Sequence, residues 1–174
     1  MKRVNGGEHA GERDPEWRDW ADQSGPGFLL FARQQARCEA DAQDLVQEAV
    51  VESWRQQGGG GPPPAGLVYA TIRRRAVDWA RRDDRRGRRE IAAHGEAPEY
   101  WFDGALEDRE RGRLIQEALG QLPEIYRDVV TLKVWGELTF AEIAAALEIP
   151  LNTASSRYRY GLMELRKRTK EALV

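Results

Sequence analysis

Residues 138–168 constrain the fold most, because they predict two short helices joined by a tight turn. Thr139 can cap the first helix through its hydroxyl while the Glu142 side chain reaches back to the free amide, which is the reciprocal pairing of a capping box. Pro150 cannot continue that helix but fits the first turn of the next one. The chain must therefore turn just before Pro150, and we predict a helix-turn-helix over these residues.

The second of these helices pairs one apolar face with other faces of small polar or cationic side chains. The polar set comprises Asn152, Ser155, Ser156, Arg157 and Arg159. An ordinary antiparallel helix pair would show the same apolar spacing, but a solvated face usually mixes charges more evenly than the six cations and two glutamates of residues 151–174. The excess favours an anionic partner and a helix that enters the major groove of DNA.

Length and composition limit the class of protein. A chain of 174 residues suits one moderate or two small domains, and 41% hydrophobic with 32% charged residues allows cores beneath a strongly polar surface. No apolar run approaches the roughly 20 residues that span a bilayer, so we expect a cytoplasmic protein with no membrane partner. The single Cys38 excludes an intramolecular disulfide and disfavours a thiolate metal site. A net charge of -2 argues against a uniformly basic coat, so the distribution of charge matters more than its sum.

Residues 14–57 predict helices with breaks between them. A short helix should open at Asp14 and Pro15 and end at the Ser-Gly-Pro-Gly run of residues 24–27. Residues 28–57 should be helical with a turn near residues 38–41. Three carboxylates, Asp41, Asp44 and Glu48, then follow at three- and four-residue spacing. They could form a metal site, a solvated acidic face, or a docking surface for a basic partner helix.

Residues 67–82 predict a basic helix whose outer surface carries Arg73, Arg74, Arg75, Arg81 and Arg82. Tyr69 and Trp79 add aromatic surface beside these cations, and single-stranded nucleic acid needs such a combination of planes and charge. An ordinary basic surface helix with aromatic residues in the core is an equal alternative. The glycine- and proline-rich run before it, residues 58–64, lacks the Lys-Ser/Thr of a phosphate-binding loop.

The charge changes sign over residues 96–110, which predicts an acidic linker with an aromatic cluster at Tyr100, Trp101 and Phe102. Beyond it, apolar spacing predicts one helix to Leu122 and another from Pro123 to Gly136. No segment alternates with period two, so we expect an all-α protein. The expected division is a flexible tail (1–13), a first helical domain (14–92), the acidic linker (93–112) and a four-helix domain containing the helix-turn-helix (113–174).

Three segments, in order, carry a resemblance to a known family. Residues 41–49 read D-A-Q-D-L-V-Q-E-A, residues 71–82 read T-I-R-R-R-A-V-D-W-A-R-R, and residues 122–157 contain L-P, E-I-A and T-A-S-S-R. They resemble, respectively, the core-binding motif, the promoter-melting helix and region 4 of the extracytoplasmic-function (ECF) group of bacterial sigma factors, within the sigma-70 family. The resemblance covers residues 28–169 and implies a promoter-specificity subunit with region 2-like and region 4-like domains.

The resemblance also implies partners and roles. The partners would be core RNA polymerase, through the clamp helices of its largest subunit and the flap of its second largest, promoter DNA, and an anti-sigma factor as a further candidate. Residues implied in polymerase binding are Asp41, Asp44, Leu45, Gln47 and Glu48. Residues implied at the -10 element are Tyr69, Arg73, Arg74, Asp78, Arg81 and Arg82. Residues implied at the -35 element are Asn152, Thr153, Ser155, Ser156, Arg157 and Arg159. No cofactor and no metal is expected.

The sequence departs from the family at Arg74, where asparagine is common, and at Ser155, where lysine is frequent. The loop before the melting helix carries no side chain larger than proline, so promoter sequence does not transfer from relatives. Two other classes remain as alternatives. A helix-turn-helix regulator would bind DNA without polymerase, usually as a dimer. An enzyme is disfavoured, because His9, His94 and Cys38 stand apart and no catalytic or metal-ligand constellation is present.

Overall fold

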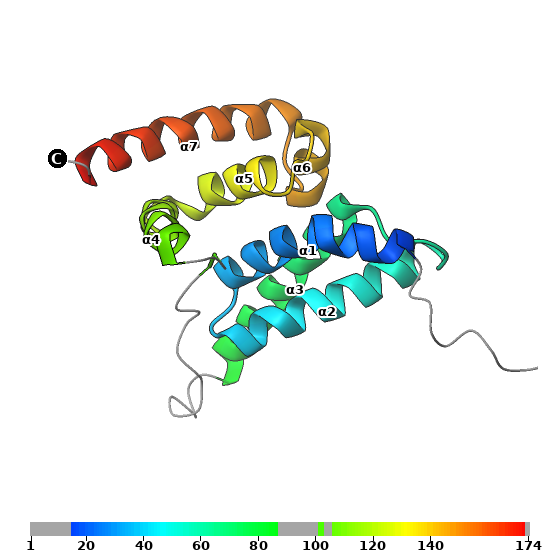
Figure 1. The fold of residues 1–174 in the computed structure, drawn as a ribbon. Coiled ribbons are helices and arrows are strands. Elements are labelled where there is room, and N and C mark those ends of the chain that lie inside the picture. The colour runs from blue at the N-terminus through cyan, green and yellow to red at the C-terminus, as the bar shows by residue number, and fades with distance from the viewer. Residues whose placement is uncertain (1–14, 87–100, 103–105, 173–174) are drawn as a thin grey trace, which may run out of the picture.

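The computed structural model describes residues 15–86, 101–102 and 106–172, and all of its regular structure there is helical (Figure 1). The described helices are α1 (Pro15–Gln35), α2 (Glu39–Gln56), α3 (Ala65–Arg86), α4 (Leu106–Gly120), α5 (Glu124–Val134), α6 (Phe140–Leu147) and α7 (Leu151–Ala172). The prediction of an all-α protein is confirmed. The expected tail lies outside the described residues.

Helix α1 corrects the expected break at residues 24–27, because it continues through Pro26 to Gln35. The residues just after the proline, including Phe28 and Phe31, are buried in the core, and their packing outweighs the hydrogen bond that proline cannot donate. A Cβ added at Gly27 would lie 2.8 Å from the Trp135 carbonyl oxygen, so the glycine permits a close approach here. Tertiary contacts therefore outweigh the local tendency of this glycine- and proline-containing run to end the helix.

Helices α1, α2 and α3 form a three-helix bundle around Phe31, Leu45 and Ile72, all fully or nearly fully buried. The predicted turn between α1 and α2 is confirmed, since α1 ends at Gln35 and α2 begins at Glu39. Inside the bundle, the buried Ser53 hydroxyl donates a hydrogen bond to Thr71 Oγ1 at 3.1 Å, which joins α2 to α3.

The predicted capping box and helix-turn-helix are confirmed at α6 and α7. The Thr139 hydroxyl accepts a hydrogen bond from the Glu142 amide at 3.2 Å, and the Glu142 carboxylate accepts one from the Thr139 amide at 2.8 Å. The Thr139 hydroxyl also donates to the Glu142 carboxylate at 2.7 Å, and this bond, together with that from the Thr139 amide, holds the pKa of Glu142 below its usual range. Helix α6 ends at Leu147, and the left-handed backbone of the next residue, Glu148 (φ 54°), turns the chain toward α7 after Pro150.

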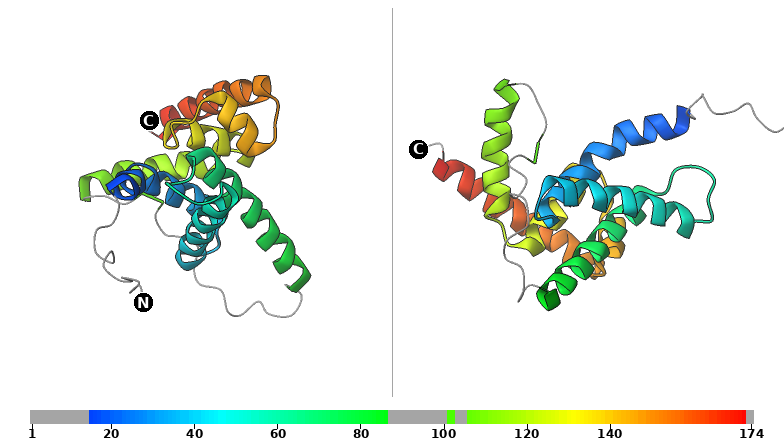
Figure 2. Two further views of the ribbon diagram at one scale, coloured as in Figure 1. Left: turned by 90° about the vertical axis from the view of Figure 1, so that its right-hand side faces the viewer. Right: turned by 90° about the horizontal axis from the view of Figure 1, so that it is seen from below.

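The two halves of the chain pack against each other. Helices α5 to α7 lie above α1 to α3 in Figure 1, and the left view in Figure 2 shows the same stacking. One buried cluster runs from Phe31 in α1 through Leu132 in α5 and Ile143 in α6 to Ala154 in α7. The principal core is therefore shared between the halves.

A second, smaller cluster lies where the end of α4 meets α5. Leu119, Leu122 and Val130 are buried there, with Trp101 and Phe102 packed against them. Two of the three linker aromatics thus contact the second half, while Tyr100 lies outside the described residues. Helix α4 begins at Leu106, inside the range expected to be linker, and most of the remaining linker lies outside the described residues.

Candidate nucleic-acid and partner interfaces

Helix α2 presents an acidic strip on the face opposite its core contacts. Asp44, Gln47 and Glu48 are exposed, and Asp41 is half-buried beside Arg37, with 3.1 Å between carboxylate and guanidinium. Leu45, which the resemblance grouped with them, is only 1% exposed and packs in the bundle. Direct contact of Leu45 with a partner is therefore wrong for this structure, and its contribution is to fix the face that α2 turns outward.

Arginines from α3 face this acidic strip. Glu48 binds Arg75, and Glu52 binds both Arg74 and Arg75, with 2.6 Å between Arg75 Nη2 and Glu52 Oε2. Glu52 was missed in the sequence, although it follows Glu48 by one helical turn. The contacts of Arg74 with Glu52 and of Arg75 with Glu48 are exposed, whereas that of Arg75 with Glu52 is part-buried, so the four side chains form one network of ion pairs at the surface. No group of His, Cys, Asp or Glu within the described residues could hold a metal ion.

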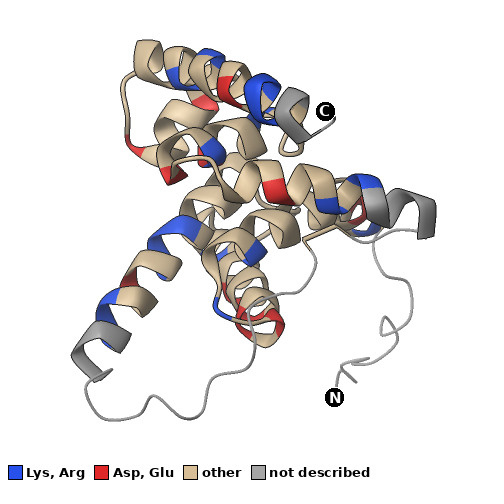
Figure 3. Cartoon of the chain, turned by 90° about the vertical axis from the view of Figure 1, so that its left-hand side faces the viewer, with Lys and Arg blue, Asp and Glu red and all other residues tan. Residues whose placement is uncertain are grey.

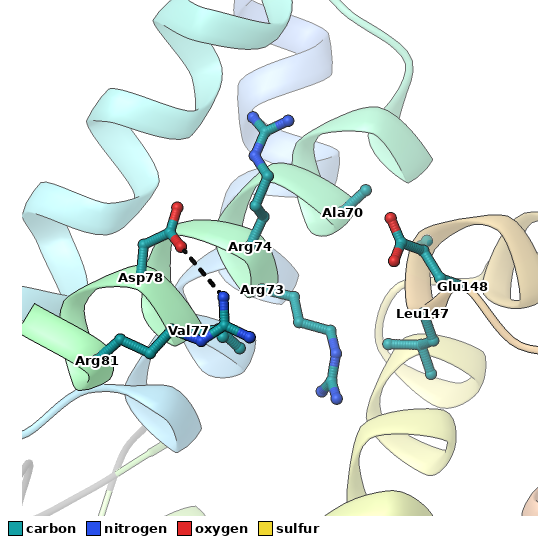
Figure 4. A pocket seen from close by; sticks show the side chains of 9 residues that line it. Ala70, Arg73, Arg74, Val77, Asp78, Arg81, Leu147 and Glu148 are labelled. Carbon is teal, nitrogen blue, oxygen red and sulfur yellow. Dashed lines mark ion pairs between the residues drawn. The ribbon is translucent and has the colours of Figure 1, made fainter.

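Helix α3 carries the arginines expected at the -10 element. Arg74, Arg81 and Arg82 are exposed, and the C-terminal half of α3 runs out of the bundle with basic residues along it (Figure 3). Asp78 lies 3.9 Å from Arg81, measured from carboxylate oxygen to guanidinium nitrogen (Figure 4). Arg74, Asp78 and Arg81 line one wall of a hollow of about 210 Å³, and Leu147 and Glu148 at the end of α6 line the other.

Tyr69 corrects the expectation of an aromatic surface on α3, because its side chain is only 2% exposed. Its ring packs against Phe28 and Phe31, with centroid separations of 4.8 and 5.6 Å, and burial raises the pKa of its hydroxyl. A direct contact of Tyr69 with nucleic acid is therefore wrong for this structure. The spacing of Tyr69, Ile72 and Ala76 on one face of the helix was the signal of a core position.

Arg73 points to a different part of the molecule from the other arginines. Its side chain leaves α3 in the opposite direction from that of Arg74 (Figure 4) and binds Asp128 of α5. The second oxygen of Asp128 accepts a hydrogen bond from Gln35 Nε2 at 2.9 Å, and Glu124 lies 3.5 Å from the same guanidinium. Burial raises the pKa of Asp128 to about 6, although Arg73 acts in the opposite direction.

The first turns of α7 present the polar set expected at the -35 element. Asn152 and Arg159 are exposed, Thr153, Ser155, Ser156 and Arg157 are half-buried, and Ala154 between them is fully buried. The hydroxyls of Ser155 and Ser156 donate to the carbonyls of Asn152 and Thr153, each at 3.1 Å. Because Ala154 anchors this turn on the core, its neighbours are held toward the outside.

Comparison with known proteins decides the family. The profile of sigma-70 region 2 matches residues 23–86, and that of sigma-70 region 4 matches residues 112–165. The ECF RNA polymerase sigma factor SigK of Mycobacterium ulcerans is 33% identical over 132 residues, which cover 72% of this chain and 70% of SigK. The chain belongs to the ECF sigma factors of the sigma-70 family. The ECF sigma factor RpoE of Cereibacter sphaeroides is also similar, at 27% identity over 144 residues, 81% of this chain and 77% of that protein.

Solved structures share the fold of this sigma factor. The sigma factor RpoE from Bartonella quintana, in complex with the anti-sigma factor NepR, superposes with a TM-score of 0.63 over 90% of this chain and 98% of that one, at 18% identity. CnrH in complex with the cytosolic domain of CnrY gives a TM-score of 0.60 over 89% and 88%, at 17% identity. By the residues that the two family profiles match, α1 to α3 fall largely in region 2 and α4 to α7 largely in region 4.

Membership of this family confirms the function inferred from the resemblance. An ECF sigma factor binds core RNA polymerase and directs transcription initiation, and its region 4 helix-turn-helix binds DNA. It is a non-catalytic subunit of the transcription machinery. The regulator that acts without polymerase and the enzyme are thereby set aside. Among the described helices, none is long and apolar enough to cross a membrane.

Proposed function

We propose that this sigma factor docks on the clamp helices of the largest polymerase subunit through the acidic strip of α2. The strip comprises Asp41, Asp44, Gln47, Glu48 and, added from the structure, Glu52. Four of these five side chains are carboxylates on one outward face, which suits a basic partner helix. Glu48 and Glu52 pair with arginines of α3 at the surface, where a basic partner helix can compete for the two carboxylates.

The arginines of α3 hold the opened strand of the -10 element in this proposal. The residues are Arg73, Arg74, Arg81 and Arg82, with Asp78 among them on the same helix. Unstacking a base costs a few kcal/mol, which neutralisation of phosphates and capture of the base must offset. When α2 binds the clamp helices, its carboxylates release Arg74 and Arg75, so docking makes cations available to DNA.

The polar turn of α7 reads the -35 element in the major groove. Asn152, Thr153, Ser155, Ser156, Arg157 and Arg159 occupy the start of the second helix of a helix-turn-helix, where base contacts are usually made. Neither region is expected to bind promoter DNA tightly alone, so tethering to polymerase supplies the effective concentration. The protein would act in the cytoplasm, where polymerase and promoters are.

Region 4 also needs a contact with the polymerase, and we assign it to the flap of the second largest subunit. Along α7, Tyr158, Leu162, Met163 and Leu165 line an apolar groove of about 600 Å³ flanked by Arg159 and Arg166. Leu162 and Met163 are exposed next to each other in this groove, and a contiguous apolar patch of this kind is typical of a site of protein contact. An anti-sigma factor, the kind of protein bound to the Bartonella quintana relative, is a further candidate partner.

The outward acidic strip of α2 is the observation that carries this proposal, and co-elution with core polymerase tests it. Purified protein and core polymerase should co-elute in gel filtration, and Asp44→Lys with Glu48→Lys should abolish co-elution. Asp22→Lys with Glu117→Lys, an equal change of charge at exposed positions of α1 and α4, is the matched control and should leave co-elution intact. Arg157→Ala should also co-elute but bind promoter DNA more weakly. Co-elution of the doubly reversed variant at wild-type levels would contradict the assignment.

A further inference from the structure

The contact between region 2 and region 4 uses a residue that promoter binding also needs. Arg73 lies on the helix assigned to the -10 strand, yet its guanidinium binds Asp128 of region 4. Asp128 is 1% exposed, and its other oxygen accepts the hydrogen bond from Gln35 of α1. One carboxylate of α5 thus joins two helices of region 2.

The surfaces around this ion pair are complementary, which indicates a specific interface. The Thr131 hydroxyl of α5 donates to Gln34 Oε1 at 3.0 Å, one position from the Gln35 contact. Gly27 and Gly136 lie where the halves meet, and a Cβ on Gly136 would come within 3.1 Å of the Tyr69 ring. Arg33 also donates to the Trp101 carbonyl at 2.9 Å. Hydrogen-bond donors therefore lie opposite acceptors across the contact, and the two glycines allow the halves to approach closely.

The same interface depends on a buried charge whose compensation is incomplete. Burying a carboxylate costs several kcal/mol, which an ion pair repays only when its geometry and its other hydrogen bonds are favourable. The charged groups facing Asp128 are Arg73 of α3 and Glu124 and Arg127 of α5. Because burial outweighs the attraction of the two arginines, the pKa of Asp128 is raised, and its charge is only partly compensated. Arg73 remains 28% exposed, so a phosphate can compete for it.

We propose that Arg73, Asp128 and Gln35 form a latch that holds region 4 on region 2 in the free sigma factor and withholds Arg73 from the -10 strand. Binding to core polymerase separates the regions, and DNA then replaces Asp128 as the partner of Arg73. The consequence for promoter binding rests on the proposed function of Arg73. The closed arrangement itself is a property of the free chain and is tested without polymerase.

The test measures the distance between the two regions in the full chain. Spin labels are attached at Arg55→Cys of α2 and Lys167→Cys of α7, both exposed positions, in a Cys38→Ser background, and read by pulsed electron paramagnetic resonance. The latch predicts one narrow short distance for the otherwise unchanged protein. Measured at about pH 8.5, well above the raised pKa of Asp128, Arg73→Gln leaves the ionised, buried carboxylate without its nearest cation and should raise the ratio of open to closed molecules at least about tenfold, with a broad, longer distance.

Two further variants make the test specific. Arg74→Gln is the matched control, because the adjacent arginine pairs with Glu52 within region 2, and it should keep the short distance. Adding Asp128→Asn to Arg73→Gln removes the uncompensated charge and should restore the short distance. Circular dichroism of each variant confirms that helix content is unchanged.

The outcomes separate the latch from the proposed function. A broad distance in the parent protein, a short distance in Arg73→Gln, an equal opening by Arg74→Gln, or no restoration in the double variant would each overturn the latch. Core polymerase added to the parent protein should lengthen the distance. Failure of co-elution with polymerase would refute the docking proposal while leaving the distances of the free chain to decide the latch.

Discussion

The raised pKa of Asp128 predicts how the stability of this protein depends on pH. The value rises from an ordinary 3.8 to about 6 because the side chain is buried between α1, α3 and α5. Since the folded state holds the proton more tightly than the unfolded state, the contribution of Asp128 to stability is fully present below about pH 3.8 and is lost as the pH rises through about 6.

The size of the effect follows from the shift of about two pKa units at about 1.4 kcal/mol per unit, which gives ~3 kcal/mol. Asp128→Asn has the same shape but no titration at this position. The free energy of unfolding of the wild type, minus that of Asp128→Asn, should therefore fall by ~2 kcal/mol or more between about pH 4 and 7.5. Other ionisable groups cancel in this difference, and a constant offset from the lost attraction to Arg73 leaves its slope unchanged.

Urea denaturation followed by circular dichroism measures both proteins at several pH values across this range. If the unfolding free energy of the wild type minus that of Asp128→Asn falls as the pH rises, the carboxylate is buried and its charge is only partly compensated. A flat difference would show that Asp128 is solvated or fully compensated. A difference that rises with pH would mean that the attraction of Arg73 outweighs burial, and would refute the reasoning.

Three other substitutions test the packing and the helix ends. Gly27→Ala should lower the free energy of unfolding by ~1–3 kcal/mol, because the added Cβ would lie 2.8 Å from a carbonyl oxygen. Gly25→Ala in the same helix is the control, since its Cβ would meet nothing within 4 Å, and it should be neutral or stabilising. Urea denaturation compares the two variants. Phe31→Ala removes a fully buried ring and should lower the free energy of unfolding by ~3–5 kcal/mol. Ile125→Ala, at a side chain that is 45% exposed, should lower it much less. Equal decreases of the melting temperature in thermal melts would contradict the described core. Thr139→Ala removes the capping box and should cost ~1 kcal/mol, seen as a lower melting temperature; an unchanged value would mean that the cap contributes nothing.

Sequence alone determined the elements whose causes lie within a few residues. The capping box of Thr139 and Glu142, the turn before Pro150 and the buried Ala154 of α7 depend on hydrogen bonds and helical periodicity along one short segment. The acidic face of α2 and the basic face of α3 were equally visible, because charge and spacing are properties of the chain itself. The family motifs lie in these same segments.

Only the tertiary structure decided which of those side chains face a partner and which face the protein. Helix α1 continues through Pro26 because the residues beyond it gain a core, and Leu45 and Tyr69 turn inward because neighbouring helices cover them. Arg73 and Asp128 meet across 55 positions of chain, a distance over which no local pattern acts. The pairing depends on how two helical surfaces fit together, and packing between elements, rather than the order of residues within one, supplies that information.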